Sequence, residues 1–262
     1  MRPFTLSIAL LSVVVAAASS PGTTPSSTTI YATPHDSYSS SVGVLGCKID
    51  TNRVAYFPSP VSCTNICISL THPSGRSLKL LRIDQSGGAH DISYDAWNYL
   101  STGYSARDKP ETGGAVEMQY RDLPPEECKG LIKTREGRLP LSASNSMNFL
   151  ASCLGESGSW VGGNYVLFNI ADAVCTWGVD ETCDLEWPER NMAECRSGLG
   201  RQVVLEGKSV VNVQYGTGKL VKAAAVGQGV EVGKNGIGRS FRLGEGLSRI
   251  RWLIVVLVVF RW

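Results

Sequence analysis

Hydrophobic and polar positions between Gly46 and Cys128 follow the pattern of short β-strands. Short apolar or alternating runs are separated by Pro, Ser and Gly, and they cover residues 53–57, 66–71, 77–83 and 116–121. Runs of this length, bounded by turn-forming residues, are typical of strands. Pro124 and Pro125 follow the last run and are expected to end it, because proline cannot donate to a sheet ladder. The pattern predicts a mainly β domain.

One helix is expected to interrupt these strands. Ser93 is in position to cap its N-terminus, and Asp95 falls in its first turn, where the helix dipole favours an anion. Gly103 would end the helix, because glycine readily adopts the left-handed conformation of a C-terminal cap. The apolar face of this helix would consist of Ala96, Tyr99 and Leu100.

Residues 133–195 have a different pattern, with a helix predicted over 144–153 and a second apolar stretch over 165–175. A segment of about 65 residues buries only a marginal core by itself unless it is cross-linked or docked. We therefore expect a partly helical extension tied by disulfides. The pattern leaves open whether this extension is a separate domain or packs against the β domain.

The N-terminal residues have the composition of an exported protein. Arg2 precedes an apolar run from Phe4 to Ala18, and small residues follow, so residues 1–20 are predicted to be a signal peptide. The run is too short for a membrane-spanning helix. Residues 21–45 are dominated by Ser, Thr and Pro and are expected to form a flexible leader, since they have few large apolar groups to offset the entropy of ordering.

The charge of the chain changes sign near residue 195. Residues 1–195 contain 14 Lys or Arg and 20 Asp or Glu, whereas residues 196–262 contain 11 and 3. This Gly-rich basic segment is predicted to be a disordered tail. It ends in an apolar run, Trp252 to Phe260, that is too short to span a bilayer. A defective lipid-anchor signal and translated sequence foreign to the natural protein remain alternatives; neither a stable membrane anchor nor a nucleic-acid partner is expected.

Eight cysteines agree with an extracellular location. An even number of thiols in an exported chain is expected to pair as disulfides, although the pairing cannot be chosen from sequence. A metal site is not expected, because the spacing of Cys63 and Cys67 is not that of a zinc ribbon and the chain has only three histidines. No cofactor is expected either. The cysteines are Cys47, Cys63, Cys67, Cys128, Cys153, Cys175, Cys183 and Cys195.

The residues with the clearest chemistry surround one predicted turn. A strand ends at Asp84, the chain turns at Gly87 and Gly88, and His90 and Asp91 precede the helix. Two carboxyl groups and an imidazole would thus lie beside one turn. Glycoside hydrolysis needs two carboxyl groups about 5–9.5 Å apart, a separation that this turn could provide.

This order of residues resembles the signature of double-psi β-barrels, the superfamily of expansins, barwins and rare lipoprotein A. Arg53 to Tyr56 is similar to the family's opening strand, and Cys63 to Leu70 is similar to its second strand. Met118 to Arg121 resembles the Val-Gln-Tyr-Arg ending of an expansin strand. The likeness extends to a group of secreted fungal proteins. It implies a six-stranded double-psi β-barrel over residues 46–132, with one or two short helices.

The resemblance also implies roles for single residues. Asp91 matches the Asp of the expansin His-Phe-Asp-Leu-Ser motif, which is the general acid in related endoglucanases, and Asp84 matches the Asp that closes the preceding strand. These two are the catalytic candidates. However, the expansin Gly-Ala-Cys-Gly-Tyr-Gly loop and the Thr-Ala-x-Gly-Glu segment of rare lipoprotein A are absent, which argues against catalysis. Nothing in the sequence positions an alternative second carboxylate among Asp50, Asp95 and Glu117.

We therefore expect a secreted protein that binds or loosens cell-wall polysaccharide, such as cellulose, chitin or glucan, without hydrolysis. One alternative is an interaction protein, a protease inhibitor or an effector that binds a host or target protein. A second is a weak glycoside hydrolase or lytic transglycosylase. The acidic cluster could also be purely structural, and its aromatic neighbours could belong to the core. The expected ligand-binding residues are His90, Asp91, Tyr56, Trp97 and Tyr120.

Overall fold

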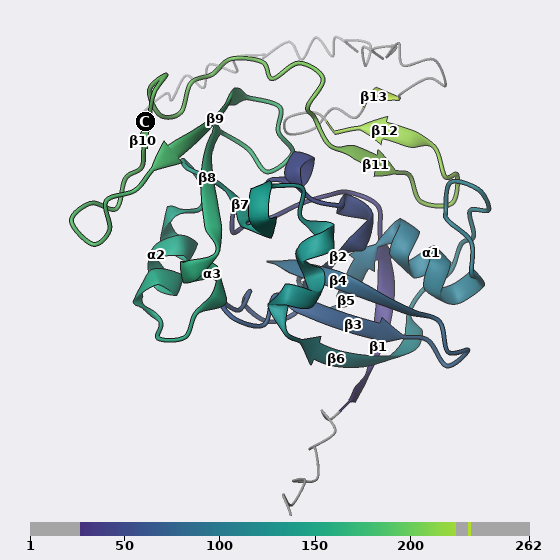
Figure 1. Ribbon diagram of the computed structural model, residues 1–262. Helices are drawn as coiled ribbons and strands as arrows, with labels where there is room; N and C mark the ends of the chain where they lie inside the picture. Colours follow the sequence, from purple (N-terminus) through teal and green to yellow (C-terminus); the bar gives the residue numbers. More distant parts are fainter. Residues whose placement is uncertain (1–26, 224–229, 232–262) are drawn as a thin grey trace, which may run out of the picture.

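The computed structural model describes residues 27–223 and 230–231, and its centre is a closed barrel of six strands (Figure 1). The order around the barrel is β1-β5-β2-β4-β3-β6. The expectation of a mainly β chain with a six-stranded barrel and a few short helices is confirmed. The strands are β1 Thr28–His35, β2 Val54–Phe57, β3 Cys67–Thr71, β4 Ser77–Gln85, β5 His90–Ser93 and β6 Val116–Leu123.

The pairing of these strands is mixed and internally symmetric. β1 is parallel to β5 and β2 is parallel to β4, while the other neighbours are antiparallel. β5 lies between β1 and β2, and β2 lies between β4 and β5. The connection from β1 to β2 therefore interlocks with the connection from β4 to β5. If β1, β2 and β3 exchange places with β4, β5 and β6, every strand keeps the same pattern of neighbours. This is the arrangement of a double-psi barrel.

The barrel interior is filled by alternate residues of each strand. Ile30 and Ala32 of β1 and Ala55 and Phe57 of β2 point into one core cluster, and α1 (Tyr94–Thr102) adds Trp97 at the end of the barrel. The other residues of β2 face outward into a second cluster. All four residues of β2 are consequently buried, as expected for a strand covered on both faces.

The second cluster joins the barrel to the extension. It contains Val54 and Leu81 of the barrel together with Leu141, Leu150 and Leu167 of the extension. Residues 133–195 thus pack on the barrel and share a core with it. The extension holds a four-stranded sheet in the order β10-β9-β8-β7 and two helices: β7 Leu139–Ser142, α2 Met147–Gly155, α3 Trp160–Gly163, β8 Tyr165–Ile170, β9 Gly178–Asp184 and β10 Glu194–Cys195.

All eight cysteines form disulfides, which confirms that expectation. Two bridges, Cys47–Cys175 and Cys63–Cys153, link segments that precede β2 and β3 to the extension. Cys67–Cys128 joins β3 to the short 3-10 helix Pro125–Leu131, and Cys183–Cys195 joins β9 to β10. Three further 3-10 turns cover Gly46–Lys48, Thr51–Arg53 and Arg135–Gly137.

The first barrel strand lies inside the segment predicted to be a flexible leader. β1 pairs with β5 on one side and with β6 on the other, and its residues Ile30 and Ala32 are buried. The prediction of a flexible leader is therefore wrong from residue 28 onward, and the barrel begins before residue 46. The segment Arg53 to Tyr56 contributes to the second strand and not the opening one. Burial and two ladders offset the ordering entropy of this polar segment.

Part of the predicted disordered tail is also folded. β11 Val211–Val213, β12 Leu220–Lys222 and β13 Val230–Glu231 form a three-stranded sheet, and Val213 packs into the barrel core. The chain runs from β10 across the top of the view to β11 (Figure 1). The predicted signal peptide and the apolar run Trp252 to Phe260 lie outside the described residues. Within the described part, none of the helices has the length and apolarity needed to cross a membrane.

The predicted helices are present with small shifts. α1 ends at Gly103, which has φ +87° as a left-handed cap requires, whereas the Ser93 side chain makes no capping hydrogen bond. The helix predicted over 144–153 is α2. The apolar stretch over 165–175 begins as β8 and continues into a turn.

Candidate functional site

Asp84, one of the two predicted catalytic carboxylates, is buried and fully occupied by hydrogen bonds. Its oxygens accept from Ser39 Oγ at 2.7 Å, Ser41 N at 3.0 Å and Gln85 N at 2.8 Å, and also from Ser41 Oγ. The residue is only 6% exposed. Asp84 thus holds the segment that follows β1 to the end of β4, and its predicted place in a catalytic pair is not compatible with this environment.

Asp91 has the opposite environment. It is half-buried on the outer face of β5, where its neighbours in register are Thr33 of β1 and Tyr56 of β2. Thr33 Oγ1 donates to Asp91 Oδ1, and no described residue donates to Oδ2. Asp91 therefore keeps one carboxylate oxygen available for a ligand.

The two carboxylates are on opposite sides of β2. Tyr56 is in register with Asp84 on one side and with Asp91 on the other. Their backbones are thus two strand spacings apart, about 9–10 Å. The backbone of β2 therefore stands between the two residues, and Asp84 has no free oxygen with which to activate water.

The alternative second carboxylates do not form a pair with Asp91 either. Asp95 is buried and bound by Arg53 Nη1 at 2.9 Å and by the Ala106 amide at 2.8 Å. Asp50 caps a 3-10 turn by accepting from Asn52 N at 3.1 Å. Glu117 is exposed on β6, where it pairs with Tyr31 on the far side of β1 from Asp91.

His90 does not share a surface with Asp91. Successive residues of a strand point to opposite faces, and His90 lies at the barrel mouth, with its ring 4.8 Å from that of Phe57. Burial and the nearby Arg82 lower the pKa of His90 and outweigh the opposing effect of Asp91. The imidazole is consequently neutral near pH 7. Asp91 and His90, although adjacent in sequence, therefore lie in different environments.

Two of the three aromatic residues expected to bind ligand are buried. Tyr56 and Trp97 are 4% and 3% exposed, and Trp97 Nε1 donates to Gly114 O at 3.1 Å inside the fold. Neither ring offers a face to solvent for stacking on a sugar, so the expectation fails for both. Tyr120 is half-buried, with its ring 5.5 Å from Phe57 and its hydroxyl donating to Asp122.

A hollow of about 440 Å³ lies on the outer face of β1, and Asp91 is not itself one of its lining residues. Thr33, which binds Asp91, forms one part of its lining. Tyr215 closes the other side: its amide donates to Asp36 Oδ2 at 3.1 Å, and its hydroxyl donates to Gly113 O at 2.7 Å. The remaining lining residues are Pro34 and His35. Exposed Tyr31 shares the outward face of β1 with Thr33.

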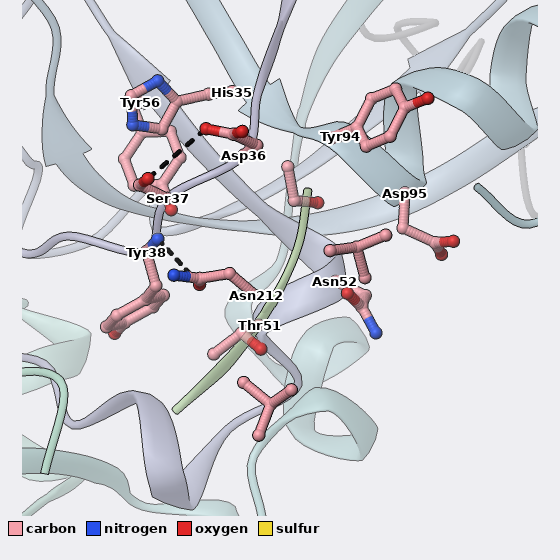
Figure 2. Close-up of a pocket in the computed structure, with 13 residues that line it drawn as sticks. His35, Asp36, Ser37, Tyr38, Thr51, Asn52, Tyr56, Tyr94, Asp95 and Asn212 are labelled. Carbon is pink, nitrogen blue, oxygen red and sulfur yellow. Dashed lines mark hydrogen bonds between the residues drawn. The ribbon is translucent and has the colours of Figure 1, made fainter. Parts of the chain in front are cut away.

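A smaller pocket lies deeper, between the end of β1, β2 and α1 (Figure 2). Its volume of about 10 Å³ corresponds to roughly one water. The His35 ring meets the Tyr56 ring edge to face at 5.0 Å, and Tyr38 N donates to Asn212 Oδ1 at 3.0 Å (Figure 2). This pocket is too small for a sugar, so the outer hollow is the candidate binding surface.

Sequence reasoning missed the residues of the outer hollow. Thr33, His35 and Asp36 fell within the presumed leader. Their signal was the alternation of Ile30 and Ala32 with polar residues, which the surrounding Ser and Thr obscured. Tyr215 carried no local signal, because its position depends on a contact with Gly113 across 102 residues.

Comparisons with known proteins identify no relative that would add residues to this site. None of the known protein families matches the chain, and no curated protein matches it. Seven solved chains match, among them the solution structure of the fungal elicitor cerato-platanin. It is 17% identical over 39% of this chain and 98% of its own, with a TM-score of 0.26. The barrel is established by its own strand pairing, and nothing about function follows from this likeness.

The described residues also give no indication of a metal centre. They contain no group of three or more His, Cys, Asp or Glu side chains arranged to hold an ion. The chemistry of the candidate site is therefore that of the Asp91 and Asp36 carboxylates, neighbouring hydroxyl groups and tyrosine rings.

Proposed function

We propose that this protein acts outside the cell by binding cell-wall polysaccharide, without hydrolysing it, at the outer hollow beside Asp91. The observation that carries the proposal is the free oxygen of Asp91, which Thr33 connects to a hollow that Tyr215 lines. Exposed Tyr31 is on the same face of β1 as Thr33. A few fixed polar groups beside aromatic rings are what a sugar site needs, since the rings contact apolar ring faces and the polar groups orient hydroxyls.

Binding without hydrolysis is supported by the state of the carboxylates. Cleavage of a glycosidic bond needs an acid and a second carboxylate across the bond. Asp84 is saturated by Ser39, Ser41 and Gln85, and Asp95 is held by Arg53 and Ala106. Asp36, the carboxylate that lines the hollow, accepts from the Tyr215 amide and from Ser37 Oγ, so neither of its oxygens is without a donor.

An extracellular location is supported by the disulfides. Four bridges that include every cysteine are typical of a protein in an oxidising compartment. The predicted export signal at residues 1–20 agrees with this location.

The test is retention on insoluble cellulose, chitin and β-glucan, with Asp91→Ala compared against wild type. Asp108→Ala is the matched control, because Asp108 is exposed and its carboxylate forms no hydrogen bond or ion pair with the described residues. We expect wild type and D108A to be retained on at least one polymer. D91A should bind that polymer about tenfold more weakly, since a charge-assisted hydrogen bond is lost.

Retention on none of the polymers, or equal retention of D91A and wild type, would contradict the proposal. Reducing-sugar release is measured in parallel. Release that disappears in D91A would replace binding by hydrolysis as the function. Inhibition of a cysteine protease that survives D91A, without polymer retention, would favour the interaction-protein alternative.

A further inference from the structure

A second hollow, of about 440 Å³, lies on the extension and shares no residue with the first. Its rim carries four cations and a single carboxylate, Glu136. The cations come from two separate segments of the chain: Lys48, Lys133, Arg135 and Arg138. We call this feature the basic groove.

The charges of the basic groove are only partly neutralised by neighbours. Lys48 Nζ is 2.6 Å from Asp180, and Arg138 Nη2 is 2.6 Å from Glu136. Arg135 is 3.9 Å from the same Glu136, and Lys133 makes no ion pair with any described residue. The groove therefore presents an excess of positive charge.

Lys48 is held rigidly in place. Its Nζ lies 4.0 Å from the centre of the Phe168 ring and is half-buried, so it loses little freedom when an anion binds. Burial would raise the pKa of Asp180, but hydrogen bonds and charges from Lys48 and Lys208 lower it below its usual value. Asp180 is thus ionised and fixes the Lys48 ammonium.

The loop that carries the other cations is also shaped locally. Thr134 Oγ1 donates to Arg138 O, and the Gly137 amide donates to Thr134 O at 3.2 Å. Glu136 has φ +63°, a left-handed conformation that is uncommon for a residue other than glycine. This turn places Arg135 and Arg138 on the rim, above a floor that includes Val166 and Phe168 of β8.

We infer that the basic groove binds an acidic polysaccharide through the carboxylates of its uronic acid residues. The volume is in the range of small-ligand sites, and Arg guanidinium groups pair well with carboxylates. Val166, on the floor of the groove, can contact a sugar ring between the charges. This site is independent of Asp91 and would allow the protein to engage neutral and acidic polymers at separate surfaces.

Other polyanions fit the basic groove less well. Binding to a membrane surface uses protruding apolar side chains, and the large exposed apolar residues of the described chain all lie outside the groove. Single-stranded nucleic acid needs open aromatic faces for base stacking. Phe168, the aromatic residue of the groove, is covered by Lys48.

The test is titration of the full chain with a galacturonic acid tetramer, followed by calorimetry at low salt. The double variant Lys133→Gln/Arg135→Gln removes two exposed rim charges without touching the core. The matched control is Arg107→Gln/Lys109→Gln, which removes two exposed charges near the end of the barrel. Cations outside the described residues are present in both variants, so the difference between them reports on the groove.

We expect K133Q/R135Q to bind the tetramer at least about tenfold more weakly than wild type, whereas R107Q/K109Q and D91A bind it normally. Affinity should fall steeply as salt is raised, and the methyl-esterified tetramer should not bind. Absence of tetramer binding, or equal weakening in both double variants, would overturn the inference. Binding to anionic lipid vesicles that is lost in K133Q/R135Q, without tetramer binding, would also overturn it. If D91A binds the neutral polymers as well as wild type does, the proposal for the outer hollow fails, but the inference for the basic groove is unaffected.

Discussion

At the scale of single residues, environment separates two aspartates of the same chemistry. Asp84 and Asp91 flank the same turn, but the serines that follow β1 fold over Asp84 and leave Asp91 at the surface. A buried carboxylate is tolerated only when its lone pairs are occupied, and Asp84 meets this condition with four donors. Asp84 is therefore a structural residue, and Asp91 is the one free to act.

Asp84→Ala is expected to lower the free energy of unfolding by about 2–4 kcal/mol, because buried donors of Ser39, Ser41 and Gln85 lose their acceptor. Equilibrium unfolding in urea measures the change. The free energies of unfolding of Asp91→Ala and of the exposed Asp108→Ala should each stay within about 0.5 kcal/mol of the wild-type value in the same experiment. Asp91 loses only the hydrogen bond from Thr33. A D84A protein as stable as D108A would show that the carboxylate does not hold this segment.

At the scale of elements, β1 determines both closure of the barrel and the geometry of the site. It pairs with β5 and β6, and without it these two strands would be open edges. Its inward residues complete the core, whereas its outward residues Thr33 and His35 line the candidate binding surface. One strand thus links stability to function through its two faces.

Adjacent substitutions in β1 should differ sharply in effect. Ala32→Lys places a charge at a fully buried position and is expected to destabilise the fold by about 3–5 kcal/mol. Tyr31→Lys, at a position 59% exposed and opposite Glu117, should change stability by less than about 1 kcal/mol. Thermal and urea unfolding of both variants check this. Equal and small effects would mean that β1 is not part of the folded barrel.

At the scale of the whole molecule, the extension and the barrel behave as one body. They share a hydrophobic cluster, and two disulfides with long sequence separations, 128 and 90 residues, connect them. The sheet of β11, β12 and β13 adds a further tie, since Asn212 accepts from the Tyr38 amide. The two hollows are therefore held at fixed positions on a common scaffold.

Removing a disulfide should matter more when it closes a longer loop. Cys47→Ala/Cys175→Ala removes a disulfide between residues 128 positions apart in the sequence. Cys183→Ala/Cys195→Ala removes one between residues 12 positions apart. We expect the first pair to lower the free energy of unfolding by about 1–2 kcal/mol more than the second, because it releases more unfolded-state entropy. Guanidinium unfolding of both double variants decides the order. The reverse order would indicate that local packing at β9 and β10 dominates.

Local pattern in the sequence was sufficient for several elements. Barrel strands β2, β3, β4 and β6, helix α1 with its Gly103 cap, and the engagement of all eight cysteines in disulfides followed from short-range periodicity, turn residues and parity, whereas strand β5 and the choice of disulfide partners did not. These features depend on a few neighbouring residues, so a single chain displays them. The class of the fold and its disulfide chemistry can therefore be inferred from the order of the amino acids.

The site was decided by tertiary contacts. Thr33 meets Asp91 across 58 residues, Ser41 meets Asp84 across 43, and the basic groove combines Lys48 with a loop near residue 135 and with β8. The pleat of β5 then directs His90 and Asp91 to opposite faces, which separates side chains that the sequence places together. Sequence alone indicated four of the six barrel strands, β2, β3, β4 and β6, but not β1 or β5. Only the closed barrel determined which carboxylate remains free, because that depends on which distant donors the fold brings to it.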